Sequence, residues 1–301
     1  MNFDVSILVL TYNHEKFILQ NLISLNEQEF SGNCEVLICN DCSTDNTRKI
    51  IESFIKENVN SKIDFKLFNH PKNLGMQNNF FWGLSQCKGE FVAICDGDDY
   101  WINSNKLEIQ VSKFRENEDI GLIFSNAKWF DDQNKEFVET PLINRVNFKT
   151  WHNIDLYIEQ GSHFLNSPTF LFRRKLVNIP LQTDLKENTI WDLFIILSIL
   201  NNGRIVYFLE EITAVYRLLL NSASRNDSRK KQFAFFLKKL STEVLFLKNK
   251  KLKKMIRTKF YNEYFDSIEK ENFIQRVEIF ALLFSKKSKI KLSKFLFKIG
   301  S

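Results

Sequence analysis

Residues 91–101 have the sequence FVAICDGDDYW, in which an apolar run is followed at once by acidic residues. A short apolar run with this boundary predicts a buried strand that ends where the carboxylates begin. Three carboxylates forced together at a strand end repel one another unless a cation is present. Hard oxygen ligands suit Mg²⁺ or Mn²⁺, which one or two carboxylates hold while substrate phosphates complete the shell. The alternative interpretation is an acidic turn, since Asp and Gly both favour turns.

Short apolar runs alternate with longer amphipathic segments through the first half of the chain. Strands are predicted at Val5–Leu10, Glu35–Cys39, Phe65–Phe68, Phe91–Cys95 and Gly121–Phe124. Helices are predicted between them at His14–Gln28, Asn46–Asn58, Gln77–Cys87 and Asn105–Glu116. This order is typical of an α/β fold whose mostly parallel sheet is joined by crossover helices.

Polar residues follow the predicted strands at Thr11-Tyr12-Asn13, Asn40-Asp41, Asn69 to Asn73 and Asp96 to Asp99. Ligands of open α/β sheets bind outside the carboxyl ends of the strands, so we expect these clusters to share one rim. A carboxylate at the position of Asp41 could accept a hydrogen bond from the imide N–H of a pyrimidine base.

The second half of the chain is less regular. Residues 126–164 are expected to form an irregular insertion anchored by Trp129, Phe130, Trp151 and Tyr157. The pattern then resumes with a strand at Thr169–Phe172, a helix from about Thr189 to Leu200, and strands near Arg204–Phe208 and Thr213–Tyr216. Beyond Ser228 the sequence predicts Lys-rich helix without turn signals. We therefore divide the chain into residues 1–227 and 228–301.

Composition and charge narrow the class of protein. Of the 301 residues, 44% are hydrophobic and 26% charged, as in an ordinary folded soluble protein. The net charge of +6 is unevenly distributed, because residues 228–301 carry +14 and the preceding part −8. No apolar stretch approaches the roughly 20 residues of a membrane span.

The five cysteines lie inside or beside apolar runs, and no secretion signal precedes Val5–Leu10. These features predict a reduced, cytoplasmic compartment. Cys39 and Cys42 form a lone CxxC, and the four histidines supply no second ligand pair, so we favour packing over zinc binding.

The basic region 228–301 has two interpretations. Phe233, Phe236, Leu237 and Leu240 alternate with lysines at helical spacing, which predicts an amphipathic helix. It is either a helical cap on the preceding domain or a peripheral attachment to an anionic membrane surface, where each nearby Lys or Arg contributes ~1 kcal/mol. No nucleic-acid partner is expected, since the aromatics follow helical spacing instead of forming a stacking platform.

Several motifs together resemble one known family. They are SILVLTYN at residues 6–13, NDCSTDNT at 40–47, Asn73-Leu74-Gly75, Lys88-Gly89-Glu90-Phe91 and the DGDDYW string at 96–101. In order and spacing they are similar to the family-two glycosyltransferases of bacterial polysaccharide and lipopolysaccharide synthesis, over roughly residues 3–217. The resemblance implies a GT-A fold, a Rossmann-like three-layer α/β/α arrangement around a mostly parallel sheet, followed here by a C-terminal helical region.

The resemblance also implies roles for matching residues. Thr11, Tyr12 and Asn13 would line the base and ribose pocket, with Asp41 on the base, and Asn73 and Gly75 would shape the loop beside it. Asp96-Gly97 would face the ribose. Asp98, with Asp96, would hold the Mn²⁺ or Mg²⁺ that bridges the diphosphate.

The family places a general base at the start of a later helix, ahead of a Gly that precedes a strand. Asp192 matches that place, since Asn202-Gly203-Arg204-Ile205 follows it. A carboxylate half buried by Trp191, Leu193 and Phe194 would have a raised pKa. Its alternative role is purely stabilising, because Asp near a helix N-terminus interacts favourably with the helix dipole.

Two departures from the family pattern bear on donor binding. Asn79-Phe80-Phe81 stands where many members have Ala-Arg-Asn, which puts a basic donor contact from that helix in doubt. Leu219 stands where many members have His after Tyr-Arg, and Arg217 or Arg225 could contact diphosphate oxygens in its place.

The resemblance implies an inverting transferase that moves a sugar from a nucleoside-diphosphate sugar, UDP-linked in our interpretation, to a glycan or lipid-linked acceptor. Two alternatives remain open. One is a catalytically inactive nucleotide-sugar-binding protein. The other is a sugar nucleotidyltransferase, which would need a Gly-rich phosphate loop after the first strand, whereas residues 11–17 contain no glycine.

Overall fold

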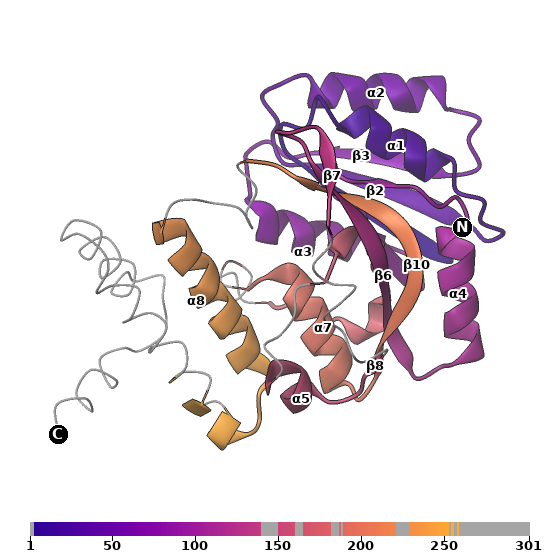
Figure 1. Ribbon diagram of the computed structural model, residues 1–301. Coiled ribbons are helices and arrows are strands. Elements are labelled where there is room, and N and C mark those ends of the chain that lie inside the picture. Colours follow the sequence, from indigo (N-terminus) through magenta and orange to yellow (C-terminus); the bar gives the residue numbers. More distant parts are fainter. Residues whose placement is uncertain are drawn as a thin grey trace.

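One mixed sheet forms the centre of the computed structural model, which describes residues 3–139, 150–159, 165–181, 187, 189–220, 229–252, 254, 255 and 258. The strand order is β3-β2-β1-β4-β9-β6-β10-β5, with β7 paired to β6 and β8 to β10. Figure 1 shows helices on both faces of the sheet. This is the three-layer α/β/α arrangement expected from the sequence.

The first four strands are parallel. They are β1 (Val5–Thr11), β2 (Cys34–Asn40), β3 (Asp64–Asn69) and β4 (Phe91–Ile94). β1, β2 and β4 are buried along their whole length and mostly apolar, because helices cover them on both faces. In the register, Thr11 lies beside Asn40 and Asn40 beside Asn69. The polar ends of these strands therefore share one rim, as predicted.

The other half of the sheet is mixed. β6 (Ile120–Asp131) and β10 (Ile205–Leu218) are parallel to each other. The antiparallel members are β5 (Tyr100–Trp101), β7 (Glu136–Val138), β8 (Thr150–Trp151) and β9 (Leu171–Arg173). Short 3-10 helices, η1 (Ser167–Thr169) and η2 (Arg174–Leu176), flank β9.

Two hydrophobic cores lie on opposite faces of the sheet. One contains the inner faces of α1 (Ile18–Asn26), α2 (Thr47–Glu57) and α4 (Lys106–Glu116). The other contains those of α3 (Met76–Gln86), α5 (Ile154–Glu159) and α7 (Trp191–Asn201). α7 is buried almost all round because α8 (Arg229–Phe246) packs against it (Figure 1).

The structure corrects several predicted boundaries. α1 begins at Ile18 instead of His14, because Thr47 Oγ1 and Asp45 Oδ2 accept the backbone N–H groups of His14 and Glu15 and hold them in a turn. The predicted strand from Thr169 begins at Leu171, after η1. The two strands predicted near 204–208 and 213–216 are the single strand β10, with register shifts around Leu209 and Ile212.

The segment expected to be irregular is partly regular. Between residues 126 and 159 it contains the second half of β6, then β7, β8 and α5. Strand β6 extends through polar residues because their side chains bind neighbouring groups: Ser125 pairs with Thr213, and Asn126 donates to the Glu210 carbonyl. Residues 140–149 and 160–164 lie outside the described part.

The C-terminal helix is interrupted. α8 ends at Phe246, and Asn249 Oδ1 then accepts the N–H groups of Lys251 and Leu252, so a new helical turn begins after a break. The side chains of Phe233 and Phe236 and the segment 286–299 lie outside the described residues. Among the helices described, none is both long and apolar enough to cross a bilayer.

Candidate active site

The acidic loop, residues 96–99, continues β4 along the carboxyl end of β1. The backbone N–H of Gly97 donates to the Leu10 carbonyl at 2.8 Å, and the N–H of Asp99 donates to the Asp96 carbonyl. A Cβ on Gly97 would lie 2.8 Å from Thr11 Oγ1 and 2.9 Å from His14 Nδ1. Glycine therefore allows the loop to pass close to two polar side chains of the β1–α1 segment.

The carboxyl groups of the acidic loop repel one another in a buried setting. Burial, helped by the charges of Asp98 and Asp192, raises the pKa of Asp96 well above its usual range. Burial and the charges of Asp98 and Asp96 raise the pKa of Asp99 in the same direction. Asp98 is half-buried. The loop thus concentrates carboxyl groups whose repulsion and burial outweigh the favourable charge of the nearby Arg217.

Asp192 lies in the first turn of α7, where its Oδ1 accepts the Leu193 N–H at 2.7 Å. Its side chain is half-buried, and burial raises its pKa to about 6. Its charge acts on Asp96, which places the two carboxylates near each other. The structure therefore brings the sequence-predicted base near the acidic loop, and its place in the first turn of α7 is also favoured by the helix dipole.

Asp41 is buried at the end of β2 and joins two loops. Its two carboxylate oxygens accept the N–H groups of Leu74 at 2.7 Å and Gly75 at 2.9 Å. Its own N–H donates to the Thr11 carbonyl. The Asn73 side chain also accepts the Gly75 N–H. Asp41, Asn73 and Gly75 thus form one hydrogen-bonded unit beside β1.

Tyr12 and Asn13 are exposed at the same rim. Asn13 has a positive φ of 56°, and its side chain accepts the Thr44 N–H while its own N–H donates to Ser43 Oγ. This exchange fixes the β1–α1 loop against the β2–α2 loop. Tyr12 is therefore presented outward beside Thr11, whose hydroxyl is buried.

Unpartnered polar atoms gather around the acidic loop. Six buried side-chain polar atoms of the described residues lack a hydrogen-bond partner: Thr11 Oγ1, His14 Nδ1, Asn21 Oδ1, Gln77 Oε1, Asp96 Oδ1 and Arg217 Nε. All except that of Gln77 belong to residues that line or bind the loop. Because an unsatisfied buried polar group is costly, this concentration points to a site completed by a ligand.

Comparison with known proteins identifies the family. Residues 6–178 match the profile described as Glycosyl transferase family 2. The chain belongs to this family. The resemblance seen in the sequence motifs is therefore confirmed, and the chain is classed with glycosyltransferases.

Three relatives of this family-2 chain illustrate the range of similarity. An uncharacterized Mycobacterium tuberculosis protein is 28% identical over 219 residues, 71% of this chain and 58% of that protein. The poly(ribitol-phosphate) beta-N-acetylglucosaminyltransferase TarS of Staphylococcus aureus is 39% identical over 104 residues, which are 34% of this chain and 17% of TarS. The Escherichia coli UDP-Glc:alpha-D-GlcNAc-diphosphoundecaprenol beta-1,3-glucosyltransferase WfgD is 34% identical over 122 residues, which are 40% of this chain and 45% of WfgD. The matches thus span less than two thirds of each of these relatives.

Solved structures confirm the GT-A fold of the family-2 chain. TarS in complex with UDP-GlcNAc superposes with a TM-score of 0.63 at 22% identity, covering 93% of this chain and 78% of that one. The mannosyltransferase PcManGT of Pyrobaculum calidifontis, in complex with GDP-Man and Mn²⁺, superposes with a TM-score of 0.60 at 14% identity. The superposition covers 100% of this chain and 80% of PcManGT.

The acidic loop of this family-2 chain fits a divalent cation. The described residues contain no group of three or more His, Cys, Asp or Glu side chains placed to hold a metal by themselves. Mg²⁺ and Mn²⁺ do not require one, because one or two carboxylates suffice when substrate phosphates complete the shell. Asp96 has a buried oxygen without a partner, and a cation would relieve the repulsion among the loop carboxylates.

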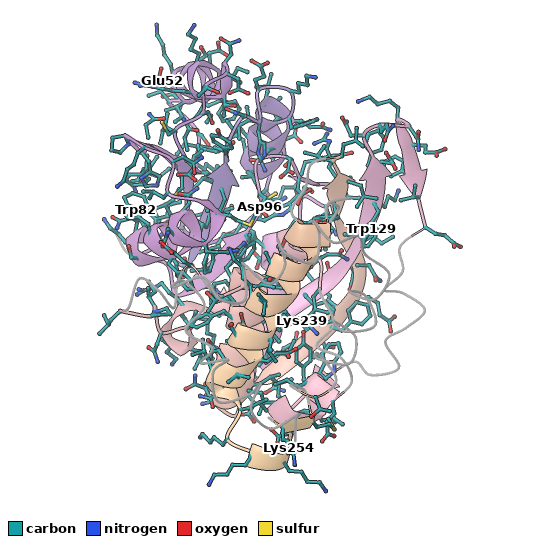
Figure 2. The ribbon with its side chains drawn as sticks, turned by 90° about the vertical axis from the view of Figure 1, so that its left-hand side faces the viewer. Glu52, Trp82, Asp96, Trp129, Lys239 and Lys254 are labelled. Carbon is teal, nitrogen blue, oxygen red and sulfur yellow. The ribbon has the colours of Figure 1, made fainter. Side chains whose placement is uncertain are left out.

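Sequence reasoning missed two residues of the loop surroundings. His14 and Asn21 follow the TYN string, and neither stands out by residue type, but Asn21 donates to the Asp96 and Asp99 carbonyls. Arg217, one of two residues that could contact diphosphate oxygens, donates through its terminal nitrogens to protein oxygens. Arg225 lies outside the described residues. In Figure 2, Asp96 lies near the centre of the view, between Trp82 and Trp129.

Proposed function

We propose that this chain transfers a sugar from a nucleoside-diphosphate sugar to an acceptor hydroxyl, with inversion at the sugar carbon. The observation that carries the proposal is the position of Asp192. Its carboxyl group, with a pKa of about 6, lies within electrostatic reach of the buried acidic loop. A group suited to accept a proton thus lies beside a group suited to grip a diphosphate.

The donor site is assigned to the shared rim. Thr11, Tyr12 and Asn13 would contact the base and ribose, together with Asp41 and the loop of Asn73 and Gly75 that it holds. The Asp41 oxygens already accept two N–H groups, but each carboxylate oxygen can accept more than one hydrogen bond. Asp41 therefore both shapes this loop and retains acceptor capacity for a base.

Asp98 and Asp96 would hold Mn²⁺ or Mg²⁺, with Asp96-Gly97 next to the ribose. The ion, when bound, neutralises negative charge on the departing diphosphate. Gly97 lets this stretch pack directly against Thr11, which joins the acidic loop to the proposed base and ribose pocket.

Asp192 is assigned the role of general base. The acceptor oxygen forms a bond to the anomeric carbon, the bond from that carbon to the diphosphate oxygen breaks, and the hydroxyl proton passes to the Asp192 carboxylate. A pKa of about 6 leaves most Asp192 ionised at neutral pH yet basic enough to accept a proton. One base and no covalent nucleophile imply a single displacement, hence inversion.

A UDP-linked donor is proposed because named relatives point to it. WfgD is described as using UDP-Glc with a lipid-linked acceptor, and TarS has been solved with UDP and with UDP-GlcNAc. The acceptor is accordingly a glycan or lipid-linked glycan of cell-surface polysaccharide synthesis.

The two alternatives make different predictions. A catalytically inactive binding protein would keep Mn²⁺-dependent UDP binding but consume no donor. A sugar nucleotidyltransferase would consume nucleoside triphosphate and sugar phosphate and release pyrophosphate. The absence of glycine from residues 11–17 disfavours this second alternative.

The test is donor turnover by wild type and Asp192→Asn. UDP release from a panel of UDP-sugars with Mn²⁺, with and without lipid-linked or polymeric glycan acceptors, should occur only in wild type. Both proteins should bind UDP with similar affinity. Equal UDP release by the two proteins would remove Asp192 from the mechanism, and no release by wild type with any donor would favour the binding protein.

For the basic region from residue 228 we propose peripheral contact with an anionic membrane surface on the cytoplasmic side. The charge of +14 supports it, and the packing of α8 on α7 supports the simpler role of a helical cap. Co-sedimentation with phosphatidylglycerol vesicles, abolished by 0.5 M salt and absent with phosphatidylcholine vesicles, tests the membrane proposal. Equal pelleting with both lipids would contradict it.

A further inference from the structure

Arg217, near the end of β10, is almost fully buried beside the acidic loop. Its backbone N–H donates to Asp99 Oδ1 at 2.8 Å, and its Nη1 donates to the Asp98 carbonyl at 2.6 Å. Its Nη2 donates to the Gln20 side chain on α1. One residue thus bonds to the backbone of the loop, to a carboxylate of the loop and to α1.

Aromatic rings fix the plane of the guanidinium group. It lies 4.9 Å from the ring centroid of Phe17 and 4.8 Å from that of Tyr100. Phe17 precedes α1 and Tyr100 follows the acidic loop directly. A flat, delocalised cation is well suited to this arrangement, whereas a Lys ammonium cannot donate in a fixed fork to two acceptors.

This geometry does not suit a direct diphosphate ligand. Both terminal nitrogens are engaged with protein oxygens, and the remaining Nε is buried. The hydrogen bonds of Arg217 instead fix the position of the loop backbone. Because Asp98 is held through its own carbonyl, a shift of this contact would move the carboxylate that the proposed function assigns to the cation.

We propose that Arg217 is a positioning residue, which clamps the Asp98–Asp99 backbone between β10 and α1 so that the loop carboxylates face a shared cation and diphosphate. The proposal rests on the proposed function for the existence of that ligand. Arg217 would act through Asp98, because both of its terminal nitrogens are already bonded to protein oxygens. Arg217 thereby helps to hold the ligand indirectly.

The chain offers a matched control in Arg173 on β9. Arg173 also stacks on two rings, Phe91 and Phe114, and donates to two backbone carbonyls, those of Ile120 and Phe114. It pairs with Phe91, at the start of β4, whereas the acidic loop follows the end of β4. Arg173 also pairs with Glu90 at 2.9 Å. Arg217→Lys and Arg173→Lys therefore each remove ring and carbonyl contacts of a largely buried guanidinium, one beside the end of β4 and the other beside its start.

The experiment measures affinity for Mn²⁺ alone and for UDP in the presence of Mn²⁺, by calorimetric titration, together with Tm. Arg217→Lys should weaken UDP binding by about 10- to 100-fold, the usual effect of removing a group that orients a metal ligand. Arg173→Lys should lower Tm by a comparable amount and leave both affinities within about twofold of wild type.

Gln20→Ala provides a second variant should Arg217→Lys fail to fold, because Gln20 is exposed on α1. It should weaken UDP binding by a smaller factor, above about twofold, with Tm unchanged. Equal UDP affinities of wild type, Arg217→Lys and Gln20→Ala would overturn the positioning role alone. A wild-type protein that binds neither Mn²⁺ nor UDP would overturn both this inference and the proposed function.

Discussion

The charge of Asp192 helps to raise the pKa of Asp96, although the two residues come from the start of α7 and from the loop after β4. Burial of both side chains strengthens their repulsion. Like charges are kept close in a folded protein when function requires them. Here the proposed function separates their roles: Asp96 faces the ion and ribose, and Asp192 accepts a proton.

The rate of transfer should depend on pH through Asp192. Because the base must be ionised, kcat/KM should fall about tenfold per pH unit below about 6 and reach a plateau above it. UDP release measured between pH 5 and 8, at saturating Mn²⁺, checks this. A profile that stays flat down to pH 5 would argue against Asp192 as the base.

Replacement of the base should stabilise the protein. The folded-state pKa of Asp192 is raised from 3.8 to about 6, so the native state binds the proton more tightly than the unfolded chain. The stabilisation is present below about pH 4 and is lost as pH rises through 6, by up to ~3 kcal/mol. Asp192→Asn, which stays neutral, should therefore unfold at a higher Tm than wild type at pH 8 and at a similar Tm near pH 4. It should reduce turnover by about 10²- to 10⁴-fold.

Alanine substitutions at two glycines can distinguish an effect on the donor-site loop from a general loss of stability. Gly75 and Gly203 both have positive φ, +80° and +67°, and a Cβ on either would meet nothing within 4 Å. Alanine at either position should cost about 1–2 kcal/mol in unfolding free energy through backbone strain. Only Gly75→Ala should weaken UDP binding, because Gly75 N–H bonds to Asp41 at the donor site. Equal UDP affinities of the two variants would indicate that the uracil of the donor binds elsewhere.

Much of the parallel half could be predicted from local sequence. Strands such as Val5–Thr11 are buried on both faces and mostly apolar, and each ends where polar residues begin, so their placement follows from the apolar runs. The shared rim then follows from topology, and it brings together Thr11, Asp41 and Asp96. The motif at residues 96–101 identified the acidic loop because its carboxylates are adjacent in the chain.

The remaining features depend on contacts between distant segments. β10 runs through Glu210 and Glu211 because it pairs with β6 on both sides of these two residues, with a register shift between Leu209 and Ile212, whereas a pattern read from one sequence breaks at those charges. The turn at His14 exists because Thr47 accepts the N–H of His14 and Asp45 accepts the N–H of Glu15 across the rim. The position of Arg217 likewise depends on Gln20 and Phe17, which no local pattern connects to it.

Position 97 is expected to tolerate only glycine. A methyl group there would lie 2.8 Å from Thr11 Oγ1 and 2.9 Å from Thr11 Cβ, and the second contact belongs to a rigid β-branched residue on β1. Gly97→Ala should therefore displace the acidic loop and weaken UDP binding by at least about tenfold. Wild-type affinity for UDP in the Gly97→Ala protein would show that the loop does not hold the nucleotide.

The most direct test of the proposed site is a calorimetric titration of UDP into the metal-free protein, repeated with Mn²⁺ present. We expect measurable binding with Mn²⁺ and none after chelation, since the diphosphate would otherwise meet the repelling carboxylates of Asp96, Asp98 and Asp99. Binding of UDP with equal affinity in the presence and absence of the metal would contradict the account.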